Sequence, residues 1–262
     1  MDEQSQTKIA LITGASSGIG LSLAKIFARE NYSLILVSRD ENKLQKVRHE
    51  LEKVSQQKIY IIAKDLSLPT GPREVFDDVQ KLDIPINVLV NNAGWGDYGA
   101  FAQSHLDKQL NMIDLNVRAV TELTHLFLPM LQSQAQGYIL NISSILGFVP
   151  GPFMSVYSAT KAYVLSFGEA LREELRGTHV SVTTLAPGQT KTNFFRRTLE
   201  ESTEPIDIIG MNADDVAHIG YQAMIQKKSV VVAGAKNKLF TFFPRFLPRQ
   251  TVATIARWMI TK

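Results

Sequence analysis

Short apolar runs rich in β-branched residues alternate along the chain with longer segments whose apolar residues return at helical spacing. The runs have the continuous apolar character of buried parallel strands. The pattern therefore predicts an α/β fold, a doubly wound parallel sheet with helices on both faces. The predicted strands cover residues 9–13, 34–38, 59–63, 86–90, 138–143 and 180–186, with a weaker one at 229–233.

The order of the predicted elements also indicates where ligands bind. A sheet of this kind binds them at the carboxyl ends of its strands, because right-handed crossovers bring the connecting loops together there. We therefore expect functional residues directly after the strands. No linker divides the 262 residues, so one domain is expected over residues 1–235, followed by an extension, 236–262, that exceeds what the sheet requires.

Composition argues against several classes of site. The 28 basic and 25 acidic residues give a charge of +3, too small an excess to indicate a nucleic-acid partner. The chain has no cysteine, hence no disulfide or thiolate site, and its five histidines lack the spacing of metal ligands. The polar start and the absence of a long apolar run predict a cytoplasmic protein without a signal peptide or transmembrane helix.

The first predicted strand runs into TGASSGIG, residues 13–20, which opens a helix. Gly14, Gly18 and Gly20 allow a tight turn and a close approach of the backbone to a ligand, and the helix N-terminus attracts a pyrophosphate. The spacing departs from the G-x-G-x-x-G pattern, so a plain glycine-rich turn is an alternative. The position between a strand and a helix favours a dinucleotide site.

The end of the second strand bears on the type of dinucleotide. A carboxylate there would bind the ribose of NAD, whereas Ser38 and Arg39 suit the extra phosphate of NADP. We therefore expect NADP(H); the alternative is that Arg39 is a solvated turn residue and Asp40 caps the next helix. Asp65, after the third strand, is either an adenine contact or a turn residue.

Tyr157 and Lys161, in the segment SVYSATKAY, are four residues apart and would share a helix face. An ammonium about 5 Å from a phenol, at an effective dielectric near 20, lowers the pKa of the phenol by about 2 units. Lys161 is therefore expected to bring Tyr157 towards the range in which a proton passes either way. An exposed surface pair is the alternative.

Taken together, these motifs resemble those of the short-chain dehydrogenase/reductase superfamily, over residues 8–232. They occur in the family's order: TGASSGIG, Asp65, NNAG at 91–94, Asn116, Ser144, YSATK at 157–161 and PG at 187–188. The resemblance implies a seven-stranded Rossmann sheet, a nicotinamide cofactor, hydride transfer between an alcohol and a carbonyl, and a homodimer or homotetramer.

The resemblance also implies roles for single residues. Tyr157 would be the general acid in reduction, while Lys161 would tune it and hold the nicotinamide ribose. Ser144 would hydrogen-bond the substrate oxygen, and its spacing from the tyrosine favours it over Ser143. Asn116 would hold the water of a proton relay. The expected cofactor contacts are Gly14, Ser16, Ser17, Gly18, Ile19, Gly20, Ser38, Arg39, Asp65, Leu66, Asn92, Ala93, Gly94, Tyr157, Lys161, Pro187, Gly188 and Thr190.

Three loops are expected to determine the substrate: residues 95–101, residues 145–154, and the segment that follows PGQT through about 209. Aromatic and aliphatic side chains in the first two predict a substrate with an apolar body, unless they pack in the core or at a subunit contact. Residues 192–204 are expected to form a mobile lid.

The extension carries aromatic and basic residues in alternation, and two prolines argue against one continuous helix. Either it packs on its own domain or on a second subunit, or it lies on a membrane surface or covers a lipid-like substrate site. Its aromatic residues are Phe240, Phe242, Phe243, Phe246 and Trp258.

The sequence therefore predicts an NADP-dependent carbonyl reductase or alcohol dehydrogenase that acts on a moderately apolar ketone or secondary alcohol. A non-catalytic NADP-binding regulator or scaffold is the alternative, although it would not need the set of Ser144, Tyr157 and Lys161. A third hypothesis is a membrane-bound, lipid-handling reductase.

Overall fold

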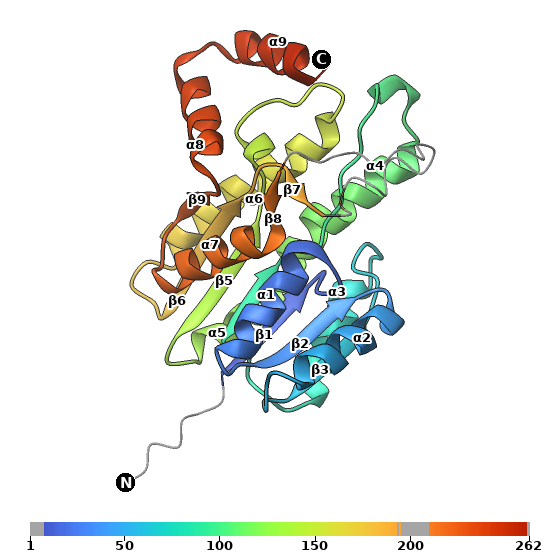
Figure 1. The fold of residues 1–262 in the computed structure, drawn as a ribbon, viewed down its shortest axis with the longest axis vertical. Helices are drawn as coiled ribbons and strands as arrows, with labels where there is room; N and C mark the ends of the chain where they lie inside the picture. The colour runs from blue at the N-terminus through green and yellow to red at the C-terminus, as the bar shows by residue number, and fades with distance from the viewer. Residues whose placement is uncertain (1–7, 193, 195–209, 261–262) are drawn as a thin grey trace.

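The computed structural model describes residues 8–192, 194 and 210–260. At its centre is a parallel sheet of seven strands in the order β3-β2-β1-β4-β5-β6-β9 (Figure 1). The predicted doubly wound Rossmann sheet is thus confirmed. The strands are β1 (Ile9–Thr13), β2 (Ser33–Ser38), β3 (Ile59–Ala63), β4 (Val88–Asn91), β5 (Gly137–Ile142), β6 (Val180–Ala186) and β9 (Val230–Val232).

Predicted and observed strand boundaries differ most at β4, which begins at Val88 rather than at residue 86. Pro85 has no N–H with which to join the ladder. Asn87 uses its side-chain oxygen to accept a hydrogen bond from the Ile9 N–H at 2.9 Å. The Asn87 backbone nevertheless bonds to both neighbouring strands, since its N–H donates to the Ile9 carbonyl at 2.9 Å and its carbonyl accepts from the Tyr138 N–H at 2.8 Å.

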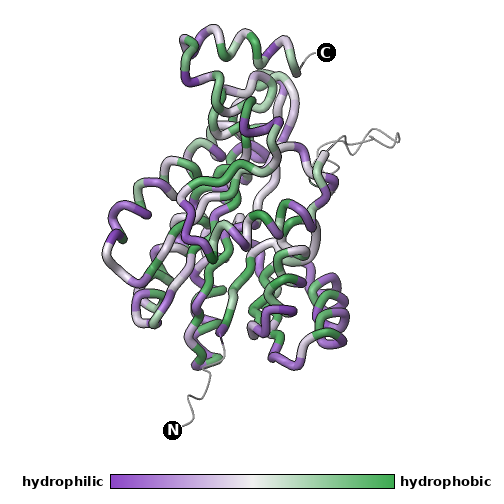
Figure 2. Tube along the Cα trace, turned by 60° about the vertical axis from the view of Figure 1, so that its left-hand side comes forward, coloured by the Kyte–Doolittle hydropathy of each residue, from purple (hydrophilic) through white to green (hydrophobic). Residues whose placement is uncertain are grey.

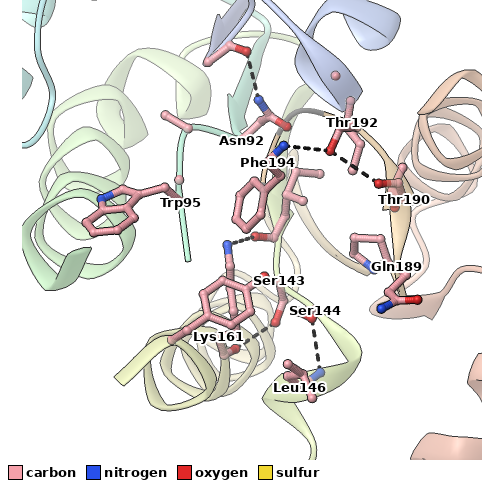
Figure 3. A pocket seen from close by; sticks show the side chains of 18 of the residues that line it. Asn92, Trp95, Ser143, Ser144, Leu146, Lys161, Gln189, Thr190, Thr192 and Phe194 are labelled. Atoms are coloured by element: carbon pink, nitrogen blue, oxygen red, sulfur yellow. Dashed lines mark hydrogen bonds between the residues drawn. The ribbon is translucent and has the colours of Figure 1, made fainter. Parts of the chain in front are cut away.

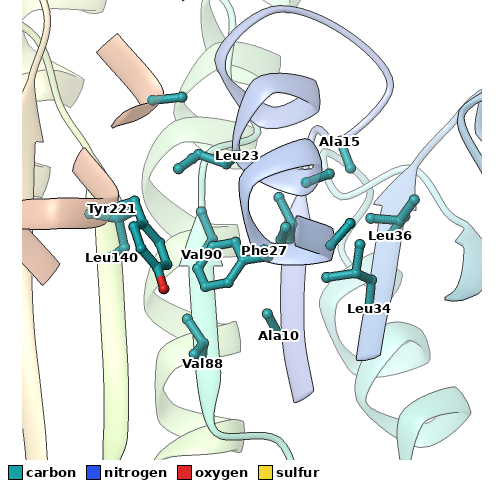
Figure 4. Packing of buried hydrophobic residues seen from close by; sticks show 14 of the residues in the cluster. Ala10, Ala15, Leu23, Phe27, Leu34, Leu36, Val88, Val90, Leu140 and Tyr221 are labelled. Carbon is teal, nitrogen blue, oxygen red and sulfur yellow. The ribbon is translucent and has the colours of Figure 1, made fainter. Parts of the chain in front are cut away.

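Helices cover both faces of the sheet, and each face has its own apolar core. On one face lie α1 (Gly18–Arg29), α2 (Glu41–Glu52) and α7 (Ala213–Ile225), and on the other α3 (Gly71–Lys81), α5 (Ala119–Gln132) and α6 (Ser155–Glu174). Phe27 of α1 is fully buried and packs edge-on against Tyr221 of α7, with ring centroids 5.2 Å apart (Figure 4). These two cores hold the sheet rigid beneath the loops at the carboxyl ends of its strands.

The strand order reverses beside β1, which pairs with β2 on one side and β4 on the other. The loops that leave β1 and β4 therefore diverge from neighbouring positions. Such a switch point is where doubly wound sheets bind ligands.

A π-helical turn, Asp114–Arg118, joins α4 (Leu106–Ile113) to α5. The Ala119 N–H bonds to the Asp114 carbonyl, five residues back, so one extra residue fits into the turn. Asn116 lies in this turn and is buried. Helical segments of this kind occur frequently at functional sites.

The C-terminal part contains a small sheet, β7 (Thr190–Lys191) with β8 (Met211–Asn212), and ends in α8 (Ala235–Phe242), a 3₁₀ turn (Phe243–Phe246) and α9 (Arg249–Ile260). The two prolines of the extension lie in the turn and just before α9, as expected for a helix break. In Figure 1, α8 and α9 lie at the end of the molecule opposite the N-terminus. Within the described part of the chain, each helix is too short or too polar to cross a membrane.

Candidate active site

A cleft of about 1400 Å³ opens at the carboxyl ends of the strands. Residues that follow β1 to β6 line it, together with residues of α6, α8 and α9. Every site residue expected from the sequence lines this cleft except Gly20 and Asn116, which pack behind it. The cleft is therefore the candidate site.

The loop after β1 has the backbone conformation that its glycines allow. Gly14 and Gly18 have φ angles of +65° and +56°, a region that disfavours side chains. Ser17 is the N-cap of α1, yet its side chain makes no capping hydrogen bond, and the first turn carries no acidic residue. The N–H groups and the positive end of α1 are therefore available to a pyrophosphate.

Asn92, directly after β4, fixes this loop from behind. Its side-chain N–H group donates to the carbonyl oxygens of Thr13 and Gly14, at 2.8 and 3.3 Å. A Cβ at Gly20 would meet the Asn92 side chain and the Gly14 carbonyl, so Gly20 serves this packing. Sequence reasoning treated Gly20 and Asn92 as cofactor contacts, whereas the structure shows that they also hold the loop in shape.

The end of β2 presents both basic and acidic side chains to the cleft. The Asp40 carboxylate accepts from the Lys43 N–H at 3.0 Å and caps α2, as the alternative interpretation held. Its hydrogen bonds with Lys43 lower the pKa of Asp40. Arg39 is exposed, lines the cleft and forms no salt bridge with any residue that the structure describes. Ser38 and Ser16 hydrogen-bond to each other at 3.0 Å.

Asp65 forms a turn with its carboxylate. One oxygen accepts from the Ser67 N–H at 2.9 Å and from the Ser67 hydroxyl at 2.7 Å. The residue nevertheless lines the cleft together with Leu66. The two interpretations made from sequence are thus compatible, because the turn positions the backbone of these residues at the cleft.

Tyr157 and Lys161 lie on one face of α6 and are both buried, with 6% and 4% of their surfaces exposed. The Lys161 Nζ lies 5.8 Å from the Tyr157 ring centroid and donates to the Ile142 carbonyl at 3.0 Å. Figure 3 shows Lys161 close to Ser143 and Ser144 in the cleft. An exposed helical pair, the alternative for these two residues, is excluded by their burial.

The two adjacent serines have different partners. The Ser143 hydroxyl donates to the Lys161 backbone carbonyl at 2.7 Å, which ties β5 to α6. The Ser144 side chain accepts from the Leu146 N–H at 3.2 Å and hydrogen-bonds with Tyr157. Both serines line the cleft, but the Ser143 hydroxyl is engaged with the helix backbone, whereas Ser144 is the partner of the phenol.

The pKa values depart from the expectation based on the lysine alone. Burial raises the pKa of Tyr157 to about 12, and the hydrogen bond with Ser144 lowers it by less. Burial also lowers the pKa of Lys161 to about 8. The lowering of the tyrosine pKa that was expected from Lys161 is thus not found, because loss of solvent dominates at this buried position.

Asn116 binds protein groups with its side chain. Its amide oxygen accepts from the Trp95 N–H at 3.2 Å, and its NH₂ group donates to the Trp95 carbonyl at 2.9 Å and the Thr160 hydroxyl at 3.1 Å. A Cβ at Gly94 would lie 2.9 Å from the Asn116 amide oxygen and 3.5 Å from the Lys161 Nζ. The π-helical turn thus positions the loop after β4 against the lysine.

Apolar side chains surround Tyr157 on its other side. It packs with Met112 and Met154, with Trp95, Leu146 and Phe194 partly buried around them. The Phe194 ring lies 5.8 Å from the Tyr157 ring, centroid to centroid, and Figure 3 shows it facing the cleft. Each of the three loops expected to determine the substrate thus contributes a side chain to the surroundings of Tyr157.

Gly96 lies in the expected substrate loop 95–101, and Phe240 was named as a possible cover of a substrate site, but the close approach of Gly96 to the phenol and the places of Ala256 and Met259 were not foreseen. Gly96 lies against the Tyr157 ring so closely that a Cβ would be 2.8 Å from a ring carbon. Phe240, Ala256 and Met259, from α8 and α9, line the cleft. Only the aromatic content of the extension indicated such a contact. Of the expected lid over residues 192–204, all but Thr192 and Phe194 lie outside the described residues.

Comparisons with known proteins agree with this geometry. A family model described as short chain dehydrogenase matches residues 8–203. An uncharacterized oxidoreductase of Staphylococcus epidermidis is 30% identical over 229 residues, which cover 86% of this chain and 94% of the relative.

Two solved structures are also similar at 30% sequence identity. A short-chain dehydrogenase from Sphingobium yanoikuyae, in complex with NADPH, has a TM-score of 0.81 over 91% of this chain and 93% of its own. The bulky-bulky ketone specific alcohol dehydrogenase from Comamonas testosteroni has a TM-score of 0.78 over 92% of this chain and 93% of its own.

Proposed function

This chain belongs to the short-chain dehydrogenase/reductase superfamily, and we propose that it transfers hydride between NADP(H) and a moderately apolar ketone or secondary alcohol. One observation carries the proposal: a buried phenol lies beside a buried lysine and a serine hydroxyl, in the cleft that the glycine loop enters. A protein that only binds a dinucleotide does not need a proton donor there.

The residues of the cleft fit a dinucleotide. The N-terminus of α1 would hold the pyrophosphate, and the backbone after β3 and β4 would hold the adenosine and the nicotinamide halves. Pro187, Gly188 and Thr190 would complete the nicotinamide end, where the Thr190 hydroxyl already donates to the Gly188 carbonyl at 3.0 Å. When bound, the nicotinamide supplies or accepts the hydride.

Tyr157 would donate a proton to the substrate oxygen during reduction. The raised pKa keeps the phenol protonated at neutral pH, which is the form that the reductive direction requires. Ser144 would donate a second hydrogen bond to the same oxygen as negative charge develops there.

Lys161 would act as a charge beside the phenol. With a pKa of about 8 it is mostly protonated at neutral pH, and its bond to the Ile142 carbonyl fixes its position. A proton given up by Tyr157 has to be replaced from solvent. The proposed relay that returns this proton passes through the π-helical turn at Asn116. The loop beside Lys161 packs against this turn.

The proposed preference for NADP(H) depends on the end of β2. Arg39, Lys43 and Lys64 line this part of the cleft, while the Asp40 carboxylate is engaged in the helix cap. A guanidinium binds a phosphate monoester through two parallel hydrogen bonds. The similar structure from Sphingobium yanoikuyae was solved with NADPH, which supports the same preference.

The proposed substrate has an apolar body. Aromatic and aliphatic side chains surround the phenol, and three more reach the cleft from the extension, whereas Asp97 and Lys108 supply the polar edge. The similarity to an alcohol dehydrogenase described as specific for bulky-bulky ketones supports a ketone with two large substituents.

We also propose that the protein is a homodimer or homotetramer. Leu106, Leu110 and Ile113 are exposed on one stripe of α4, and Tyr163 is exposed on α6. Such a stripe of large apolar side chains is typical of a helix that packs against another chain.

The proposal is tested by following NADPH absorbance with a panel of ketones that ranges from acetone to diaryl ketones. We expect turnover with bulky apolar ketones and at least tenfold lower kcat/KM for acetone. NADPH binding without turnover of any panel member would favour the regulator or scaffold instead. Absence of both binding and turnover would refute the proposed function outright.

A further inference from the structure

The extension, residues 236–262, differs in charge from the rest of the chain. Six of the 28 basic residues lie there and none of the 25 acidic ones, so the remainder of the chain has 22 basic against 25 acidic residues. The extension is thus cationic on a molecule that is otherwise slightly anionic. Its basic residues are Lys236, Lys238, Arg245, Arg249, Arg257 and Lys262.

Large apolar side chains are exposed on the same elements. Phe246 is 71% exposed and Phe243 is 56% exposed, and Trp258 on α9 is 58% exposed. Phe242 connects the first two into one cluster, with ring centroids 5.2 Å from Phe246 and 6.2 Å from Phe243. Leu239 adds to it one turn earlier on α8. Figure 2 shows hydrophobic and hydrophilic positions interleaved along this end of the molecule.

The two helices are anchored to the domain rather than hanging free. Thr241 of α8 is buried, and so are Val252 and Ala256, which share one face of α9. The Arg257 guanidinium of α9 lies 5.9 Å from the ring centroid of Phe153, a residue of the loop before α6. The opposite side of α9 therefore presents Trp258 outwards on a fixed platform.

Aromatic side chains beside lysine and arginine, without any acidic residue, are typical of a surface that lies on an anionic bilayer. A protein partner could also cover the aromatic cluster, but the uniform sign of the charge matches lipid headgroups best. Neither α8 nor α9 is long enough to span a bilayer. The helices would therefore lie in the interface.

We propose that α8, the turn Phe243–Phe246 and α9 dock on a lipid bilayer that contains anionic headgroups. The aromatic rings enter the interface, and Lys238, Arg245 and Arg249 bind the headgroups. The same helices line the cleft with Phe240, Ala256 and Met259, so docking brings the cleft close to the bilayer. The proposal does not depend on the proposed reaction.

The test is co-sedimentation of the full chain with vesicles of phosphatidylcholine, alone or with about 30% phosphatidylglycerol. We expect binding to the anionic vesicles that weakens at least tenfold when NaCl rises from about 50 to about 500 mM, because salt screens the headgroup charge. No binding to anionic vesicles at low salt overturns the proposal. Equal binding to both kinds of vesicle, insensitive to salt, overturns the part played by the charges.

Two variants separate the contributions. Phe243→Ser with Phe246→Ser, and separately Lys238→Glu with Arg245→Glu and Arg249→Glu, should each weaken binding at least tenfold. The matched control replaces three exposed lysines near α2, Lys46, Lys53 and Lys58, with glutamate and should bind as the wild type does. Undiminished binding by either extension variant refutes the proposal. The proposal is also refuted if the wild type does not bind vesicles and the serine variant is a monomer where the wild type is a dimer. That result would assign the aromatic cluster to a contact between copies of the chain.

Tryptophan fluorescence gives a measurement that needs no change in the extension. Trp95 and Trp258 are the two tryptophans of the chain, so Trp95→Phe leaves only the reporter on α9. Its emission should shift to shorter wavelength on addition of anionic vesicles, as the indole leaves water. An unchanged spectrum at saturating vesicle concentration contradicts docking through α9.

Discussion

Replacing Lys161 by methionine should change how the stability of the protein depends on pH. Burial lowers the pKa of Lys161 from 10.5 to about 8 in the folded chain. Between these two values the unfolded chain binds more protons than the folded one, so the free energy of unfolding rises with pH. Below the folded pKa the lysine is charged in both states, and its desolvation destabilises the fold most.

The magnitude follows from the two pKa values. From pH 7 to pH 9.5 the lysine alone contributes a rise of about 2 kcal/mol in the free energy of unfolding. Methionine has a similar length and no charge, so the variant lacks this rise. Compared with the wild type, the variant should therefore be relatively more stable at pH 7 than at pH 9.5.

The assay is urea unfolding of the cofactor-free wild type and variant at the two pH values. The wild-type free energy minus that of Lys161→Met should increase by about 2 kcal/mol between pH 7 and 9.5. Lys46→Met, at an exposed position on α2, is the control and should keep a constant difference from the wild type. The same constancy for Lys161→Met would refute the burial argument.

Two further predictions concern the cofactor and the serines. Arg39→Ala should reduce the ratio of NADPH to NADH affinity by about tenfold, because the charged hydrogen bonds to the phosphate are lost, while Lys46→Ala should leave the ratio unchanged. Fluorescence titration with both cofactors measures the ratio. An unaltered ratio in Arg39→Ala contradicts the assignment. Ser144→Ala should lower kcat by about 100-fold, and Ser143→Ala should change kcat much less; both variants lose a buried hydrogen bond, so each should lower the free energy of unfolding by about 1–3 kcal/mol. Steady-state kinetics distinguish the two variants, and a larger loss of kcat in Ser143→Ala than in Ser144→Ala would exchange the roles of the two serines.

Local pattern was enough to predict much of the sheet. The runs at β1, β3 and β6 were predicted at their observed boundaries, because a buried parallel strand needs an uninterrupted apolar run between polar loops. The position of the phosphate loop followed from the same alternation, since the glycines had to fall between a strand and a helix. At β4, by contrast, the apolar run was predicted from residue 86, whereas the strand begins at Val88.

Long-range packing was beyond the reach of the pattern. Nothing in the spacing of α9 indicates that Met259 lines the same cleft as Tyr157, about a hundred residues earlier. The same holds for Gly96, whose lack of a side chain admits the tyrosine ring. The pKa of Tyr157 was expected in the wrong direction because burial, unlike the distance to Lys161 on a helix, is not a local property of the sequence.

The central claim, that the Tyr157 hydroxyl is the proton donor of the reaction, is tested most directly by Tyr157→Phe. This change removes one oxygen and keeps the ring that packs against Gly96 and Phe194. NADPH affinity should stay within about threefold of the wild type, while kcat with the best ketone of the panel falls at least about 100-fold. Turnover that persists at the wild-type rate in this variant would contradict the account.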